Sequence, residues 1–200
     1  MLLFRLWPAI FVLVAFVMPA GAASITLDFE SFLDGDNLST QLPGLTFTNT
    51  VIYSAGASLN ELELPPRSGS NVASDLGGAI TVTFDTPVAA IWAYFTYLVP
   101  VTLDAYDSGN KLLGSVSASF LTNLAQSGDP GSTANERLQV AFAAGIARLV
   151  VTGDPGGGSF VMDDLAFGDL ESSAVPEPST QFLFGGGLVL IGAVMTWRRR

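Results

Sequence analysis

The chain has 200 residues, with 18 acidic and 8 basic side chains and neither cysteine nor histidine. The missing residue types exclude Ser-His-Asp and Cys-His catalysis, disulfide bonds and the usual zinc sites. Removing the four basic residues and one acidic residue of the two apolar ends leaves 4 basic against 17 acidic residues, a formal net charge of −13 for residues 24–174. A surface with this charge repels nucleic acid, so we expect no nucleic-acid partner.

The first 23 residues have the organisation of a secretory signal peptide. Arg5 supplies the positive charge, Leu6–Met18 is an apolar run, and Ala20–Ala23 offers small residues for signal peptidase. The run is too short to favour an uncleaved membrane anchor. We therefore predict a signal peptide at 1–23 and export of the chain.

Alternation of apolar and polar residues with period two dominates residues 24–170 and indicates short β-strands. The predicted strands cover residues 25–30, 45–53, 80–85, 88–98, 101–106, 112–119, 136–142, 147–152 and 160–167. Loops rich in Gly, Pro, Ser and Asp are predicted at 65–78, 126–134 and 153–158, and Asp107–Asn110 has the composition of a hairpin turn. This pattern predicts one all-β domain at 24–170, an antiparallel β-sandwich of jelly-roll type.

One acidic residue stands out in the last predicted strand. Strict alternation places Asp163 on the same face as Val161, Leu165 and Phe167. A carboxylate on a core-facing stripe needs a partner, because burying an unpaired charge is very costly.

A structural calcium ion is one partner that would suit this carboxylate. Glu30 in the first strand and Asp163 in the last are the predicted ligands, with Asp34 and Asp36 of the following loop as further candidates, because Ca²⁺ prefers oxygen ligands. The alternatives are that Asp163 binds a backbone amide or Arg148, or that the strand has the opposite register.

The C-terminal region combines a short motif, an apolar run and a basic end. Pro176-Glu177-Pro178 lies in a predicted linker at 171–181, and residues 182–200 comprise the uncharged run Phe182–Trp197 and Arg198–Arg200. As a helix the run would rise about 24 Å, slightly less than the roughly 30 Å hydrocarbon core, so flanking residues must help it to span a membrane. A buried core helix would show a polar face, which this run lacks. The arginines favour a cytoplasmic end, which places the domain outside.

This tail resembles the PEP-CTERM sorting signal of Gram-negative bacteria, with Pro176, Glu177 and Pro178 at the positions of the motif. The resemblance implies that exosortase, a membrane-embedded enzyme, cleaves near the motif. It also implies that the protein is anchored in the inner membrane with its domain in the periplasm. After processing it would reach the cell surface or the extracellular space.

The middle of the chain is similar to the β-sandwich domains common among PEP-CTERM proteins and to galactose-binding-like and carbohydrate-binding jelly rolls. The similarity rests on ITVTFDTPVAAIWAYF, VTLDAYDSGNKLLGS and FVMDDLAF. Carbohydrate-binding jelly rolls often have a calcium site between the first and last strands, which is what this resemblance implies for Glu30 and Asp163.

Aromatic residues between positions 92 and 106 either fill the core or stack on sugar rings. They are Trp92, Tyr94, Phe95, Tyr97 and Tyr106. We expect most of them in the core and Tyr106 at the surface.

Three functions follow in order of preference. The first is a non-enzymatic envelope or extracellular-matrix protein that exosortase sorts. The second is a carbohydrate-binding module for exopolysaccharide. The third is a glycan hydrolase that uses carboxylates, which no particular pair of acidic residues favours.

Overall fold

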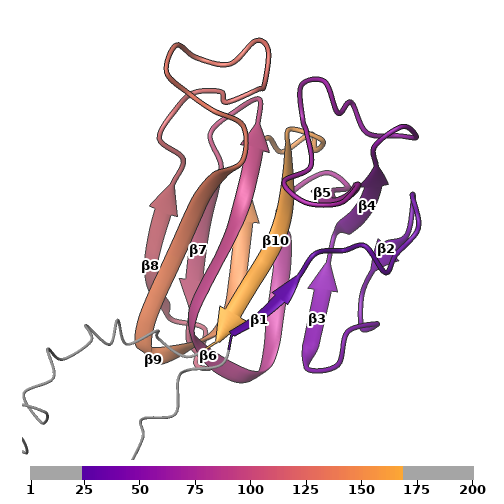
Figure 1. Ribbon diagram of the computed structural model, residues 1–200. Helices are drawn as coiled ribbons and strands as arrows, with labels where there is room; N and C mark the ends of the chain where they lie inside the picture. The colour runs from indigo at the N-terminus through magenta and orange to yellow at the C-terminus, as the bar shows by residue number, and fades with distance from the viewer. Residues whose placement is uncertain (1–23, 169–200) are drawn as a thin grey trace, which may run out of the picture.

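The computed structural model describes residues 24–168, which form ten β-strands and contain no helix (Figure 1). The predicted signal peptide and the PEP motif with its apolar run lie outside these residues. No helix capable of crossing a membrane occurs among residues 24–168. The strands are β1 (Ser24–Leu27), β2 (Asn37–Leu38), β3 (Leu45–Thr48), β4 (Thr50–Ser54), β5 (Asn71–Asp75), β6 (Ile80–Tyr97), β7 (Thr102–Tyr106), β8 (Leu112–Ser117), β9 (Glu136–Thr152) and β10 (Phe160–Gly168).

Two long strands, β6 and β9, run through both layers of an antiparallel sandwich. Residues 80–83 of β6 pair with the second half of β9, whereas residues 90–95 pair with its first half, and the register shifts between these segments. The first sheet contains β2, β4, β5, β10 and β1 with the second half of β6 and the first half of β9. The second sheet contains β3, β7 and β8 with the other halves. Two pairs of predicted strands, 80–85 with 88–98 and 136–142 with 147–152, are therefore single bent strands.

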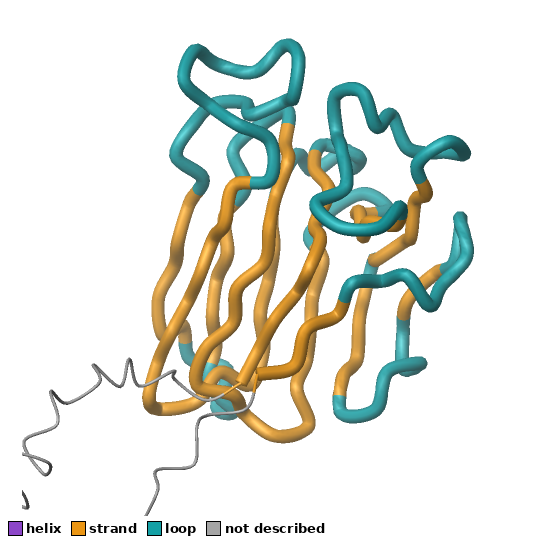
Figure 2. Tube along the Cα trace, in the orientation of Figure 1, coloured by secondary structure: helices purple, strands orange, loops and turns teal. Residues whose placement is uncertain are grey.

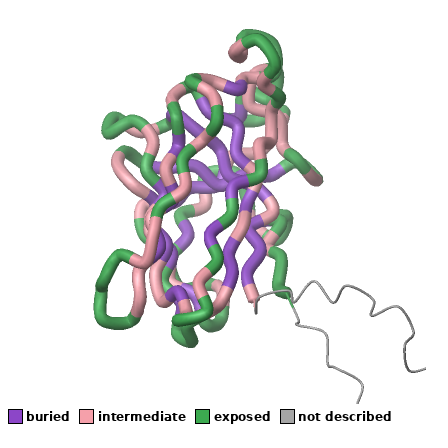
Figure 3. Tube along the Cα trace, turned by 90° about the vertical axis from the view of Figure 1, so that its left-hand side faces the viewer, coloured by how far each residue is buried: buried purple, intermediate pink, exposed green. Residues whose placement is uncertain are grey.

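The core lies between the two sheets and follows the predicted alternation. In the second sheet Val82, Leu149 and Leu103 are fully buried, while Thr81 and Arg148 on the opposite face are partly exposed. Full burial of such an aliphatic side chain stabilises the fold by roughly 1.5–3 kcal/mol. Buried residues fill the interior and exposed residues concentrate in the loops (Figure 3).

Three further predictions for strands and loops are wrong. The predicted strand 45–53 is interrupted at Asn49, which has a φ of 61°, and its two parts enter different sheets as β3 and β4. The first strand ends at Leu27, before Phe29 with a φ of 60°. β5 lies inside the predicted loop 65–78 and is buried along its whole length.

A bulge in β10 changes which residues face the core. Asp164 has a φ of 47°, and the pairing of β10 with β6 jumps between Asp163 and Ala166. Val161 and Asp163 consequently face away from the core, while Leu165 and Phe167 face into it. The expectation that Asp163 shares the face of Leu165 and Phe167 is therefore wrong.

Candidate functional site

A long loop packs against the outer face of the first sheet. This covering loop, residues 55–70, contributes Leu59 and Leu64 to a small apolar cluster with Val72 and Val161. Together with residues 118–135 it lies at the end of the sandwich opposite the two chain ends (Figure 2).

Hydrogen bonds to Asp163 connect the covering loop to β10. Its Oδ2 accepts hydrogen bonds from the backbone N–H groups of Arg67 (2.8 Å) and Ser68 (3.0 Å), and its Oδ1 accepts one from Asp164 (2.6 Å). The side chain is only 1% exposed, and this burial raises its pKa to about 6. Of the alternatives left open above, a backbone-amide partner is the one found.

Glu30 holds the C-terminal end of the same loop. Its Oε1 accepts hydrogen bonds from the N–H groups of Ser70 (2.9 Å) and Asn71 (2.7 Å). Asn71 in return donates to the carbonyls of Phe29 (3.1 Å) and Phe32 (2.8 Å). Glu30, which follows β1, and Asp163 of β10 thus bind neighbouring parts of one loop.

The two further calcium candidates bind other backbone groups. Asp34 accepts hydrogen bonds from the Ser58 hydroxyl and the Ser54 N–H, and these bonds lower its pKa. Asp36 accepts one from the N–H of Leu33 at 2.8 Å. Within residues 24–168 no three acidic side chains gather where they could hold a metal ion.

Thermal unfolding decides between the calcium site expected from the sequence and the backbone hydrogen bonds that Glu30 and Asp163 make here. Because N–H groups already occupy oxygens of both Glu30 and Asp163, we expect the same melting midpoint in EGTA and in millimolar CaCl₂. MgCl₂ at equal ionic strength is the control. A midpoint that rises with CaCl₂ alone would establish a calcium site.

The aromatic residues divide between the core and the outer faces. Phe95 and Tyr97 are fully buried, but the expectation that most of the five aromatic residues fill the core is wrong, because the other three lie on outer faces. Tyr94 and Trp92 are half-buried on the outer face of the first sheet, and Tyr106 is half-buried on that of the second.

An arginine lies over each of the three half-buried rings. The guanidinium carbon is 3.5 Å from the ring centroid for Arg67 on Tyr94, 5.1 Å for Arg137 on Trp92 and 4.0 Å for Arg148 on Tyr106. The surface that sequence reasoning missed is the one around Trp92. The sequence did contain one indication of it: in the period-two alternation, Trp92 falls on the same face as Tyr94 and on the face opposite to Phe95.

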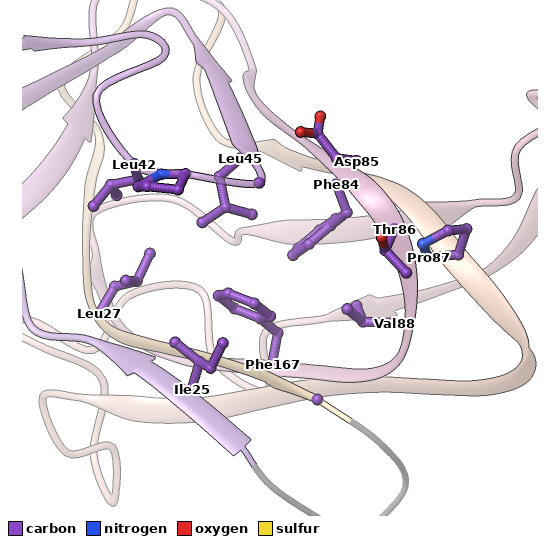
Figure 4. Close-up of a pocket in the computed structure, with 13 residues that line it drawn as sticks. Ile25, Leu27, Leu42, Leu45, Phe84, Asp85, Thr86, Pro87, Val88 and Phe167 are labelled. Carbon is purple, nitrogen blue, oxygen red and sulfur yellow. The ribbon is translucent and has the colours of Figure 1, made fainter.

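A separate cavity of about 480 Å³ opens at the end of the sandwich from which both chain ends leave (Figure 4). Phe84 and Phe167 line it with their rings 5.2 Å apart, and Ile25 of β1 flanks it. The carboxylate of Asp85 points away from the cavity (Figure 4). The cavity therefore presents mainly apolar groups.

Comparison with solved structures finds low-identity β-sandwiches. The K2 cleaved adhesin domain of Lys-gingipain is 15% identical with a TM-score of 0.47, covering 72% of this chain and 99% of that one. A family 29 carbohydrate-binding module solved with mannohexaose is 11% identical with a TM-score of 0.40, covering 74% and 93%. No curated protein matches the chain.

The family comparison concerns the C-terminal end. Residues 174–200 match the PEP-CTERM protein-sorting motif, as predicted from Pro176-Glu177-Pro178 and the run that follows. The chain is therefore a β-sandwich protein that carries a PEP-CTERM sorting signal.

Proposed function

We propose that the protein is a non-enzymatic component of the cell envelope or extracellular matrix that exosortase delivers. The observation that carries the proposal is the sorting motif at residues 174–200. Signal peptidase removes residues 1–23, and the tail holds the chain in the inner membrane with its domain in the periplasm. Processing near the motif then moves the domain to the cell surface or beyond.

The use of the acidic side chains supports a structural role for the domain. Like Asp163 and Glu30, Glu63 accepts backbone N–H groups, from Gln126 (3.1 Å) and Ser127 (3.2 Å), and Asp129 accepts the N–H of Leu121 (2.8 Å). Carboxylates that order loops in this way act as fixed hydrogen-bond acceptors. Carboxylate-based glycan hydrolysis is the less favoured proposal, and it requires turnover that single Asp or Glu substitutions abolish.

Replacing Pro176, Glu177 and Pro178 with alanine tests the sorting proposal. We expect the variant to stay full-length in the membrane fraction, because the prolines bias residues 175–178 to an extended strip that a protease can bind. Immunoblots of cell fractions and mass spectrometry of the native C-terminus measure the effect.

Glu171→Ala, a charge change in the same linker, is the control and should be processed like the wild type. An unchanged mature form in the triple variant would refute the sorting proposal.

Polysaccharide binding is the second candidate function. The observation that favours it is the half-buried Trp92 with the exposed polar side chains of Arg137 and Gln139 beside it on the outer face of the first sheet. Aromatic rings with a few placed polar groups are typical of ligand sites.

A further inference from the structure

On the outer face of the first sheet, Trp92 is partly exposed and lies beside exposed Gln139, whereas Ala166 on its other side is buried. In the cross-strand row that contains it, Trp92 pairs with Gln139 of β9 and Ala166 of β10, and Ala166 pairs with Thr26 of β1. Four adjacent strands at about 4.8 Å spacing make this row roughly 14 Å wide. We name Trp92, Gln139, Arg137, Ala166 and Thr26 the Trp92 face.

The neighbouring row of this face consists of small residues. The next row toward the chain ends consists of Ala141, Ala90 and Gly168, so no long side chain rises from it. On the other side, Arg67 of the covering loop lies over Tyr94 and closes the surface. The Trp92 face is thus bordered by small residues on one side and by Arg67 of the covering loop on the other.

The hydrogen-bond donors of the Trp92 face are available to a ligand. Arg137 and Gln139 are exposed, and within residues 24–168 Arg137 makes only its cation–π contact with Trp92. The other arginines differ in this respect, because Arg67 pairs with Asp164 at 3.1 Å and Arg148 donates to Asn110. Arg137 therefore keeps its donors for a ligand.

The charge of the domain selects the class of ligand. With a formal net charge of −13 for residues 24–174, the domain repels polyanions. One unpaired arginine does not offset that repulsion, whereas its N–H groups are good donors to uncharged hydroxyls. An aromatic ring beside fixed donors suits a ring that has an apolar face and an edge of hydroxyl groups.

We infer that the Trp92 face binds a neutral polysaccharide at its accessible side chains, Trp92, Arg137 and Gln139. The exposed Arg137, which lies over the indole in this structure, swings aside so that the indole stacks on one pyranose ring, and Arg137 and Gln139 donate hydrogen bonds to the hydroxyls of that ring. This site rests on the second candidate function above and deepens it.

Affinity electrophoresis of the full-length protein in detergent tests the site. The gels contain a neutral glucomannan, a neutral xylan or polygalacturonate, each at 50 mM and 500 mM NaCl. We expect retardation by a neutral polymer that changes less than twofold with salt, because no net charge is neutralised. Trp92→Ala should weaken this binding at least tenfold, and Arg137→Ala about threefold.

Trp92→Phe keeps an aromatic face and should retain part of the binding, which separates loss of stacking from loss of folding. Tyr106→Ala, the matched aromatic of the second sheet, should bind like the wild type. Loss in Tyr106→Ala with none in Trp92→Ala would overturn this site and leave polysaccharide binding standing. Retardation by polygalacturonate alone would overturn the neutral ligand class, and no retardation by any polymer would overturn both the site and the second candidate function. Sorting of Trp92→Ala, followed by immunoblot, should match the wild type in every case, so the sorting proposal is tested separately.

Discussion

Gly157→Ala should lower the free energy of unfolding by about 3 kcal/mol. Gly157 has a φ of 84°, which L-residues rarely adopt, and a Cβ there would lie 2.4 Å from the backbone nitrogen and 2.5 Å from the Cα of Gly77. The left-handed conformation costs alanine roughly 1–2 kcal/mol, and forced overpacking costs roughly 1–3 kcal/mol more. Because the opposing atoms are backbone, two loops must separate to admit the methyl group.

Gly131→Ala is the matched control. Its φ of 86° is nearly the same, but nothing lies within 4 Å of the added Cβ. We expect it to lose only the conformational cost, roughly 1–2 kcal/mol. Urea unfolding of both variants measures the difference, and equal losses would show that the contact with Gly77 has no energetic effect.

Asp163→Ala should lower the free energy of unfolding by about 2–4 kcal/mol. The N–H groups of Arg67 and Ser68 would lose their acceptor at a part-buried position, and each unsatisfied donor costs roughly 1–3 kcal/mol. The covering loop should also become accessible, which limited proteolysis would detect. Glu61→Ala, an exposed acidic residue of the same loop, is the control and should be neutral. If Asp163→Ala were cleaved as slowly as the wild type, Asp163 would not be needed to hold the covering loop in place.

The same residue should make stability depend on pH in an unusual direction. Burial raises the pKa of folded Asp163 to about 6, against roughly 3.9 when unfolded, so the folded state holds the proton more tightly. Its contribution to stability is fully present below about pH 4 and is lost as pH rises through 6. The free energy of unfolding of the wild type, measured relative to that of Asp163→Asn, should therefore decrease between pH 4 and pH 7. A difference that stays constant over this range would contradict the raised pKa.

Much of the fold is readable from the sequence where one face of a strand is polar. The alternation in 101–106 and the turn at Asp107–Asn110 correctly predict the β7–β8 hairpin. β5 escapes prediction because Asn71–Asp75 has little apolar character, and its burial comes from the core on one side and the covering loop on the other. Such two-sided burial is a tertiary effect that a period-two pattern does not encode.

The candidate site is harder to predict for two physical reasons. Side chains in a regular strand alternate strictly, so Asp163 and Leu165 would share a face. The bulge at Asp164, whose backbone is left-handed, interrupts this alternation and puts them on opposite faces. In 88–98 the aromatic and aliphatic residues occupy both faces, so hydrophobicity does not separate buried Phe95 from half-exposed Trp92. The exposed face of this strand is recognised only from the neighbouring strand, because the polar residues Arg137 and Gln139 lie beside Trp92.

The place where the chain leaves the domain determines how the sandwich bears mechanical tension. Gly168, at the end of β10, pairs with Ser24 at the start of β1, and β10 is hydrogen-bonded to β6 on one side and to β5 and β1 on the other. A pull on the C-terminal end of β10, such as an anchored tail would exert, acts along the strand, while its hydrogen bonds lie across it. The load is therefore shared as shear by the bonds on both edges. Under such a pull many hydrogen bonds of β10 bear the load together, whereas an edge strand peeled from its end loses them one at a time.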